Sequence, residues 1–277
     1  MKFISKLLNK ARYSALVALG SLALQSSSAV FGMQGSNVSS SAAPNSNKNI
    51  TDLSYLALNG NGQVKEDFLA CYVPLHKLQG LEIKDCGAKL DLQTLFIKVM
   101  LLCQNLRQFN LVNNCLTALP VVIGNFENLQ SLNLENNLLK TLPDSIGQLK
   151  NLQALNFSNN PLTNLPSTIG KLTKLKYLLL IDCKLIVLPQ AIGQLTNLEI
   201  LNLTRNQLIA LPAAIGQLTN LNILKLSGNQ LTELPATINK LMSAQIYLYG
   251  NQFADDEVTQ QMFAGLIARG IRVYVYN

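Results

Sequence analysis

The side chains that most often carry out chemistry are few in this chain of 277 residues, and they are scattered. His76 is the only histidine, and Cys71 is the cysteine nearest to it. A zinc site needs a cluster of Cys and His ligands, and no further ligands stand at a suitable spacing from these two. No glycine-rich phosphate loop and no pair of carboxylates at one site is evident either. We therefore expect no enzymatic activity, no metal and no cofactor.

The main feature of the sequence is a repeat of 23 residues with the pattern L-x-x-L-x-L-x-x-N-x-L-x-x-L-P-x-x-I-G-x-L. The L-x-L segment alternates with period two, which predicts a short strand, and the later apolar residues return the chain to the same core. A single repeat leaves its core open above and below, so the repeats must stack. The first leucine recurs at Leu106, Leu129, Leu152, Leu175, Leu198 and Leu221.

Three other recurrent residues have structural roles in this interpretation. An asparagine follows each strand, where its amide can satisfy backbone groups that a buried turn leaves unpaired. Cys183 takes this place in one repeat. A proline fixes φ as the chain leaves the core, and a glycine four residues later predicts a tight turn with positive φ on the convex side. The glycines are Gly124, Gly147, Gly170, Gly193 and Gly216.

The repeats become irregular towards both ends. Residues 52–105 contain two weaker matches, one at Leu78, Leu81, Ile83 and Cys86 and an earlier one at Leu53, Leu56, Leu58 and Asn61, which could equally be a chance match on a capping segment. Residues 106–253 hold the regular repeats. The pattern of residues 254–277 predicts a helix with an apolar stripe, followed by a last strand. We interpret this segment as a C-terminal cap that covers the open core; the alternative is a helix that binds a partner. The stripe is Val258, Met262, Phe263, Leu266 and Ile267.

The N-terminal segment resembles a targeting sequence. Residues 1–32 have a basic start, an apolar stretch from Ala15 to Leu24 and small residues at Ser27-Ser28-Ala29. This pattern predicts a secretory signal peptide, with a mitochondrial presequence as the alternative. Residues 33–51 are rich in Ser and Asn and predict a disordered linker. The apolar stretch is too short to span a bilayer as a helix. We therefore expect no membrane span once the signal peptide has been cleaved.

Charge and thiols narrow the expected compartment and partner. The net charge of +7 falls to +3 without the four basic residues of the signal segment, and no Lys/Arg cluster remains to bind nucleic acid. The cysteines are odd in number, and we expect them to be unpaired and buried. Unpaired thiols in an exported chain fit bacterial export, with a reducing host interior as one destination. The cysteines are Cys71, Cys86, Cys103, Cys115 and Cys183.

The form L-x-x-L-P-x-x-I-G-x-L, as in residues 139–149, resembles the leucine-rich-repeat superfamily. It is most similar to the 23-residue class of Ras-suppressor-like and plant intracellular proteins and of bacterial effectors. This resemblance implies an α/β fold: a right-handed horseshoe solenoid with a parallel sheet on its concave face and short helices or turns on its convex face. It also implies protein–protein recognition without shared catalytic residues. Related bacterial ubiquitin ligases carry a further catalytic domain with a cysteine nucleophile, and no cysteine follows Cys183.

Outward strand positions predict where a partner binds. In the middle repeats these positions are small or polar, and from Leu175 onward they become aromatic and aliphatic with basic neighbours. Adjacent coils lie about 4.8 Å apart, so the apolar positions form one patch of the kind that protein interfaces favour, unless it is ordinary surface or is covered by the cap. The predicted partner-binding residues are Tyr177, Leu179, Ile181, Ile200, Arg205, Ile223, Lys225, Tyr247 and Tyr249.

The sequence thus predicts a monomeric, secreted or exported bacterial module that recognises another protein on its concave face, with delivery into a host cell as one outcome. The alternative is an envelope or periplasmic structural component that binds a cell-surface polymer or a neighbouring protein. Disulfide-bonded cysteines would favour the envelope, and free thiols would favour a host target.

Overall fold

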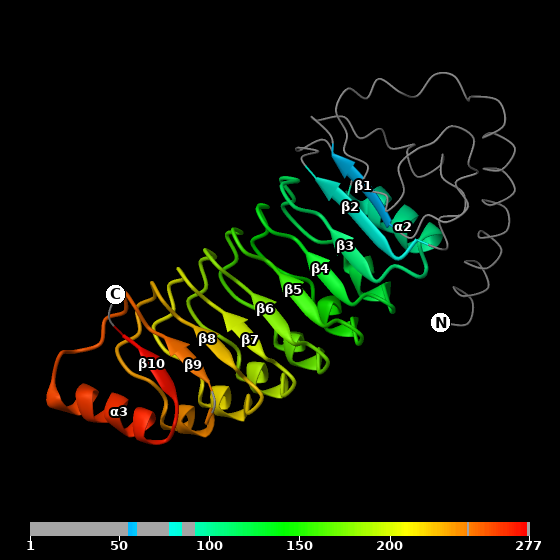
Figure 1. The fold of residues 1–277 in the computed structure, drawn as a ribbon. Helices are drawn as coiled ribbons and strands as arrows, with labels where there is room; N and C mark the ends of the chain where they lie inside the picture. Colours follow the sequence, from blue (N-terminus) through cyan, green and yellow to red (C-terminus); the bar gives the residue numbers. More distant parts are fainter. Residues whose placement is uncertain (1–54, 60–77, 85–91, 243, 276–277) are drawn as a thin grey trace, which may run out of the picture.

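The computed structural model describes residues 55–59, 78–84, 92–242 and 244–275, so the predicted signal peptide and linker lie outside the described residues. Its strands form one ten-stranded sheet in sequence order, and every neighbouring pair is parallel (Figure 1). The strands are β1 Tyr55–Asn59, β2 Gly80–Lys84, β3 Gln108–Asn110, β4 Ser131–Asn133, β5 Ala154–Asn156, β6 Tyr177–Leu179, β7 Ile200–Asn202, β8 Ile223–Lys225, β9 Gln245–Tyr247 and β10 Arg272–Tyr274.

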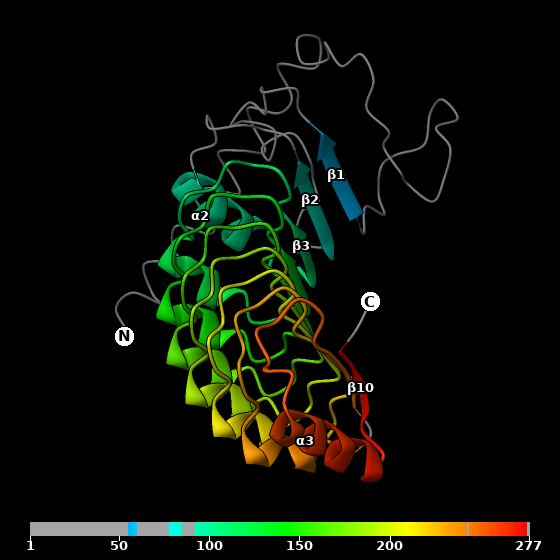
Figure 2. The same cartoon turned by 90° about the vertical axis from the view of Figure 1, so that its left-hand side faces the viewer.

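The opposite side of the stack consists of short 3₁₀ helices, one for each regular coil (Figure 2). Each is preceded by the repeat's proline in an extended conformation, which starts the turn as the sequence predicts. The fold is therefore the predicted solenoid, with strands on one face and short helical turns on the other. The 3₁₀ helices are η4 Val121–Asn125, η5 Asp144–Gln148, η6 Ser167–Lys171, η7 Gln190–Gln194, η8 Ala213–Gln217 and η9 Ala236–Lys240.

Between the two faces runs one continuous apolar core from Leu78 to Ile271. The inward strand residues stack in register, for example Leu155 on Leu178 and Leu178 on Leu201. All three side chains are buried. Because each coil's apolar side chains pack against the next coil, stability is a sum over neighbouring interfaces.

The buried asparagines satisfy backbone groups of the turns, as the repeat predicts. They follow one another along the stack, and we call this series the asparagine ladder. Asn137 Oδ1 accepts hydrogen bonds from the backbone N–H groups of Asn114 and Leu116, at 3.0 Å each. Its Nδ2 donates to the backbone oxygens of Leu111 at 2.8 Å and Leu134 at 2.9 Å. One side chain thus satisfies four backbone groups in two adjacent coils. Related bonds recur at Asn160, Asn206, Asn229 and Asn251.

Cys183 interrupts this ladder. Its Sγ donates to the Phe157 carbonyl oxygen at 3.5 Å, but a thiol is a poor acceptor. The Leu162 N–H, which would donate to an asparagine at that position, donates instead to the Asn160 carbonyl oxygen at 2.8 Å, across Pro161. The turn at Pro161 therefore satisfies the Leu162 N–H within its own coil, whereas the equivalent N–H groups of Leu116 and Leu139 donate to an asparagine of the next coil.

The prediction of positive φ at the recurrent glycines is wrong. Gly170 and its equivalents lie in the 3₁₀ helices and have no positive φ. A Cβ on Gly170 would lie 2.5 Å from the backbone oxygen of Ala191 in the next coil, so glycine is required for close approach of the coils. Positive φ occurs instead at the residue before each ladder position, where the strand ends: Asn113, Asn136, Asn159, Asp182, Arg205, Gly228 and Gly250.

A helix lies at each end of the stack: α2 Leu92–Leu102 and α3 Glu257–Ala268. The Asp256 carboxylate caps α3 by accepting from the Thr259 N–H at 2.8 Å, and this hydrogen bond lowers the pKa of Asp256. The predicted apolar stripe on α3 is only partly buried. Phe263 and Leu266 pack on the core, whereas the outer positions of the stripe are exposed, Val258 at 75% and Ile267 at 57%.

The two weaker N-terminal matches both supply strands. β2 carries the buried Leu81 and Ile83, and β1 pairs with it along its whole length. The earlier match is therefore a strand of the sheet, while its flanking Leu53 and Asn61, and Cys86 of the later match, lie outside the described residues. None of the helices in the described part of the chain has the length and apolar character that crossing a membrane would require.

Candidate partner-binding face

The strands and the turns that follow them place eight of the nine predicted partner-binding residues on one side of the sheet, which we call the sheet face. The register aligns Tyr177, Ile200 and Ile223 in a first row that runs across β6, β7 and β8. A second row contains Leu179, Lys225 and Tyr247, with Asn202 between the first two. Ile181 and Tyr249 lie two residues beyond this row, in the turns that follow β6 and β9.

These side chains are only partly exposed to solvent. Tyr177 is 37% exposed, and the other seven are half-buried by their neighbours on adjacent strands. Half-buried aromatic and aliphatic side chains in contact offer apolar area whose conformational freedom is already restricted. A partner that covers them therefore loses less side-chain entropy than it would on a surface of long, free side chains.

Arg205 occupies a different position from the other eight. It lies in the turn after β7 with a positive φ of 56°. Its guanidinium forms an ion pair of 2.9 Å with the Asp182 carboxylate, which occupies the same turn of the preceding coil. Arg205 is thus at the edge of the sheet face and is already paired.

An aromatic cluster lies on β9, β10 and the turn after β9. The rings of Tyr247 and Tyr274 stack with centroids 4.6 Å apart and planes 11° apart. Tyr249 contacts Tyr247 with a centroid distance of 6.3 Å, and the Lys225 Nζ lies 5.6 Å from the centroid of the Tyr247 ring. This cluster is pre-organised because each ring restricts its neighbour.

Tyr274 and Arg272 are absent from the predicted set, although they extend its rows. Arg272 pairs in register with Gln245, and Tyr274 pairs with Tyr247. The alternation of the last strand was available in the sequence as the signal for both. The sequence alone does not place this strand on the sheet face, because the same alternation also fits a C-terminal cap.

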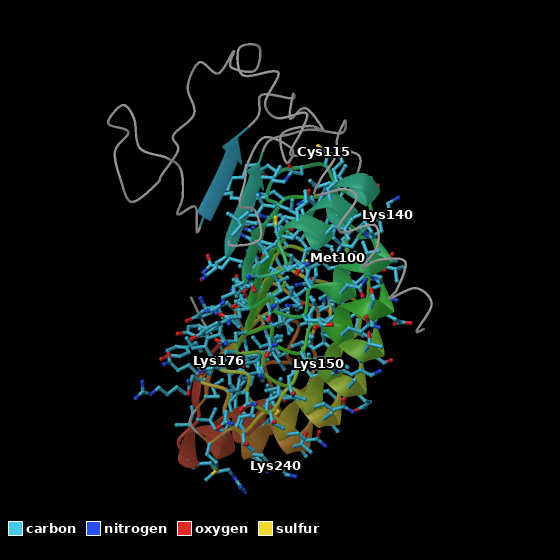
Figure 3. The ribbon with its side chains drawn as sticks, turned by 90° about the vertical axis from the view of Figure 1, so that its right-hand side faces the viewer. Met100, Cys115, Lys140, Lys150, Lys176 and Lys240 are labelled. Carbon is cyan, nitrogen blue, oxygen red and sulfur yellow. The ribbon has the colours of Figure 1, made fainter. Side chains whose placement is uncertain are left out.

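An ion pair borders the patch at β6 and β7. Lys176 Nζ lies 2.9 Å from Glu199 Oε1, and the Tyr177 hydroxyl donates to the other carboxylate oxygen at 3.3 Å. The hydrogen bond and charge of Glu199 raise the pKa of Lys176, and Lys176 correspondingly lowers the pKa of Glu199. Both side chains are accessible to solvent, so their pairing orients Tyr177 more than it stabilises the fold. Figure 3 shows Lys176 on the strand side of the stack.

The N-terminal half of the sheet face is chemically different. Its outward residues on β2 to β5 are polar or small, and several bond to each other. The Asn110 amide donates to Glu82 at 2.9 Å, and the Asn156 amide donates to Glu135 at 3.1 Å. The sheet face is therefore divided into an amide-rich half, which carries Glu82, Lys84 and Glu135, and an aromatic, aliphatic half.

Two of the three cysteines in the described residues are poor nucleophiles. Burial raises the pKa of the Cys103 thiol to about 12 and that of Cys183 to about 11. Cys115 is exposed, which corrects the expectation that all thiols are buried, and it lies towards the N-terminal end of the stack (Figure 3). No group of three potential metal ligands occurs in the described part of the chain.

We predict that alkylation at pH 8 separates these thiols. Iodoacetamide will modify Cys115 in the native protein, while Cys103 and Cys183 will react only after denaturation, because the thiolate is the nucleophile and burial suppresses it. Peptide mass spectrometry with and without urea measures this for each site. Equal native labelling of Cys183 and Cys115 would show that the stack opens at the interrupted ladder.

The geometry defines a class: a parallel-stranded solenoid with a chemically divided sheet face. Comparison with known families agrees, since the sequence matches the family profile "Leucine-rich repeat region" over residues 122–207 and the profile "Leucine Rich Repeat" over residues 220–241. The chain belongs to the leucine-rich-repeat family. A search of curated proteins gave no significant match.

Solved structures of similar fold come from different organisms. A leucine-rich-repeat protein of Leptospira interrogans is 32% identical with a TM-score of 0.61, over 82% of this chain and 62% of that one. The ectodomain of the Arabidopsis thaliana receptor kinase GASSHO1/SCHENGEN3, solved in complex with Casparian strip integrity factor 2, is 27% identical with a TM-score of 0.65, over 81% of this chain and 27% of that one. A TDR receptor is 25% identical with a TM-score of 0.59, over 71% of this chain and 34% of that one. The chain thus spans less than two thirds of each.

Proposed function

We propose that this chain is a protein-binding module and that its partner lies on the C-terminal half of the sheet face. Leucine-rich-repeat folds commonly mediate protein–protein binding, and the family is typically a non-enzymatic scaffold. The main support for this location is that the aromatic cluster of Tyr247, Tyr249 and Tyr274 continues into the aliphatic rows of β6 to β8. A contiguous, partly ordered Tyr-rich surface is typical of interface centres.

We also propose that the protein is exported, on the basis of the signal-like residues 1–32. The similar receptor structure is an ectodomain, which is consistent with a fold that works outside the cell. The finer assignment to a bacterial effector and the alternative of an envelope component differ in thiol state. Cys103, Cys115 and Cys183 are free thiols in this structure, which favours a reducing destination over the oxidising envelope.

The test is a pull-down or proximity-labelling experiment with the full chain as bait. A variant with Tyr177→Ala, Tyr247→Ala and Tyr249→Ala removes the aromatic part of the patch. The matched control carries Gln108→Ala and Ser131→Ala, which alter the first row of the polar half. We expect the control to capture the same protein as the wild-type bait and the tyrosine variant to lose it, with an affinity at least about 30-fold weaker.

Two outcomes would contradict the proposal. Capture of the same protein by the tyrosine variant at unchanged affinity would place the binding surface elsewhere on the solenoid. Loss of capture by the control alone would assign binding to the polar half of the sheet face. Circular dichroism of each bait checks that the variants keep the fold.

A further inference from the structure

Acidic side chains are distributed unevenly along the sheet face. The carboxylates of its N-terminal half, Glu82 and Glu135, bond to asparagine amides on the neighbouring strands. The outward residues of β7 to β10 include no acidic side chain: Ile200, Asn202, Ile223, Lys225, Gln245, Tyr247, Arg272 and Tyr274.

Lys225 and Arg272, the two cations of this C-terminal part, form no ion pair with a carboxylate of the described residues. The ion pairs within the described residues are Lys84 with Glu82, Lys176 with Glu199, and Arg205 with Asp182. Neither Lys225 nor Arg272 takes part in them. Lys225 rests against the Tyr247 ring, and a cation held against an aromatic face keeps N–H donors free for an anion. Glu199, at the border of the patch, is already bound to Lys176 and Tyr177.

The register places Arg272 at the end of an apolar row and Lys225 in the neighbouring row. Tyr177, Ile200 and Ile223 lie side by side on successive strands, and the same row continues through Gln245 to Arg272. Two strand spacings separate Ile223 from Arg272, roughly 10 Å, which is about three residues of an extended chain. A chain that crosses the strands along this row would therefore meet apolar side chains first and a cationic site about three residues later.

We propose that the partner binds through an extended peptide segment that carries an aspartate or glutamate side chain about three residues from its apolar contacts. This proposal rests on the proposed function and specifies its ligand. The apolar side chains of the segment cover Tyr177, Ile200 and Ile223. The carboxylate lies between Lys225 and Arg272, with Tyr247 beneath it.

The experiment selects a random linear peptide library on the immobilised full chain and then measures the affinities of the enriched peptides by fluorescence anisotropy. We expect peptides with an acidic residue about three positions from an apolar pair. Their affinity should fall at least about tenfold with Lys225→Glu plus Arg272→Glu, and it should fall with rising salt. A Lys140→Glu plus Lys150→Glu variant, which reverses two exposed charges away from the strands, is the control and should bind as the wild type does.

The outcomes separate this inference from the proposed function. Enriched peptides that lose binding with Tyr177→Ala and Tyr247→Ala but tolerate both charge reversals, or that lack an acidic residue, overturn the acidic segment and leave the binding face intact. Peptides that tolerate all of these sheet-face variants contradict both. A library without enrichment overturns the linear segment, because a folded partner surface would then be required.

Discussion

Replacing Asn137 with alanine will lower the free energy of unfolding by about 3 kcal/mol or more, the largest loss we expect from any single polar residue. The side chain bonds to the backbone groups of Asn114, Leu116, Leu111 and Leu134, and Asn137 itself is 3% exposed. Alanine would leave these buried groups unpaired in two adjacent coils. Urea unfolding followed by circular dichroism measures the change.

The control for this prediction is Asn164→Ala, which alters an exposed asparagine in the following coil. We expect it to change stability by less than about 0.5 kcal/mol, because a surface position far from such bonds is near neutral. Equal effects of the two substitutions would show that composition rather than the buried ladder determines the loss. An Asn137→Ala protein as stable as the wild type would contradict the ladder as a source of stability.

Replacing Gly170 with alanine will destabilise the protein by about 1–3 kcal/mol, because the added methyl group overpacks the contact between coils. Its Cβ would lie 2.5 Å from the Ala191 backbone oxygen and 3.1 Å from the Ala191 Cβ. The η6 and η7 turns would have to separate, which strains the core on both sides. Thermal unfolding of the variant measures the loss.

Gly265→Ala provides a matched control of opposite sign. Gly265 lies within α3, and a Cβ there would meet nothing within 4 Å. Alanine has a higher helix propensity than glycine, so this variant should gain about 0.5–1 kcal/mol. If both substitutions stabilised the protein, the glycines of the 3₁₀ helices would be dispensable and the close-approach explanation would be wrong.

The fold could be predicted from the sequence because the same apolar and turn residues recur at the same spacing in each repeat. The spacing of leucines determines the strand, and the asparagine determines how the turn is satisfied, as at Asn137 and Asn160. The role of the glycines could not be predicted, because glycine serves both positive φ and close approach. Only the distance from Gly170 to Ala191 in the next coil separates the two.

The candidate site was predictable in its rows but not in its contacts. Alternation along a strand gives the outward positions, so Tyr177, Ile200 and Tyr247 fall on one face as expected. Which side chains touch depends on rotamers and on the last strand's register. The stacking of Tyr247 on Tyr274 and the pairing of Arg205 with Asp182 are therefore findings of the structure alone.

The most direct measurement of the central claim is hydrogen–deuterium exchange of the full chain with and without a partner captured by it. We expect protection concentrated in the peptides that contain β6 to β9 and the turns after them, residues 177–181, 200–204, 223–227 and 245–249. The 3₁₀ helices η6 to η9 on the opposite side should exchange unchanged. Protection centred on those helices, with none on the strands, would contradict the sheet face as the binding surface.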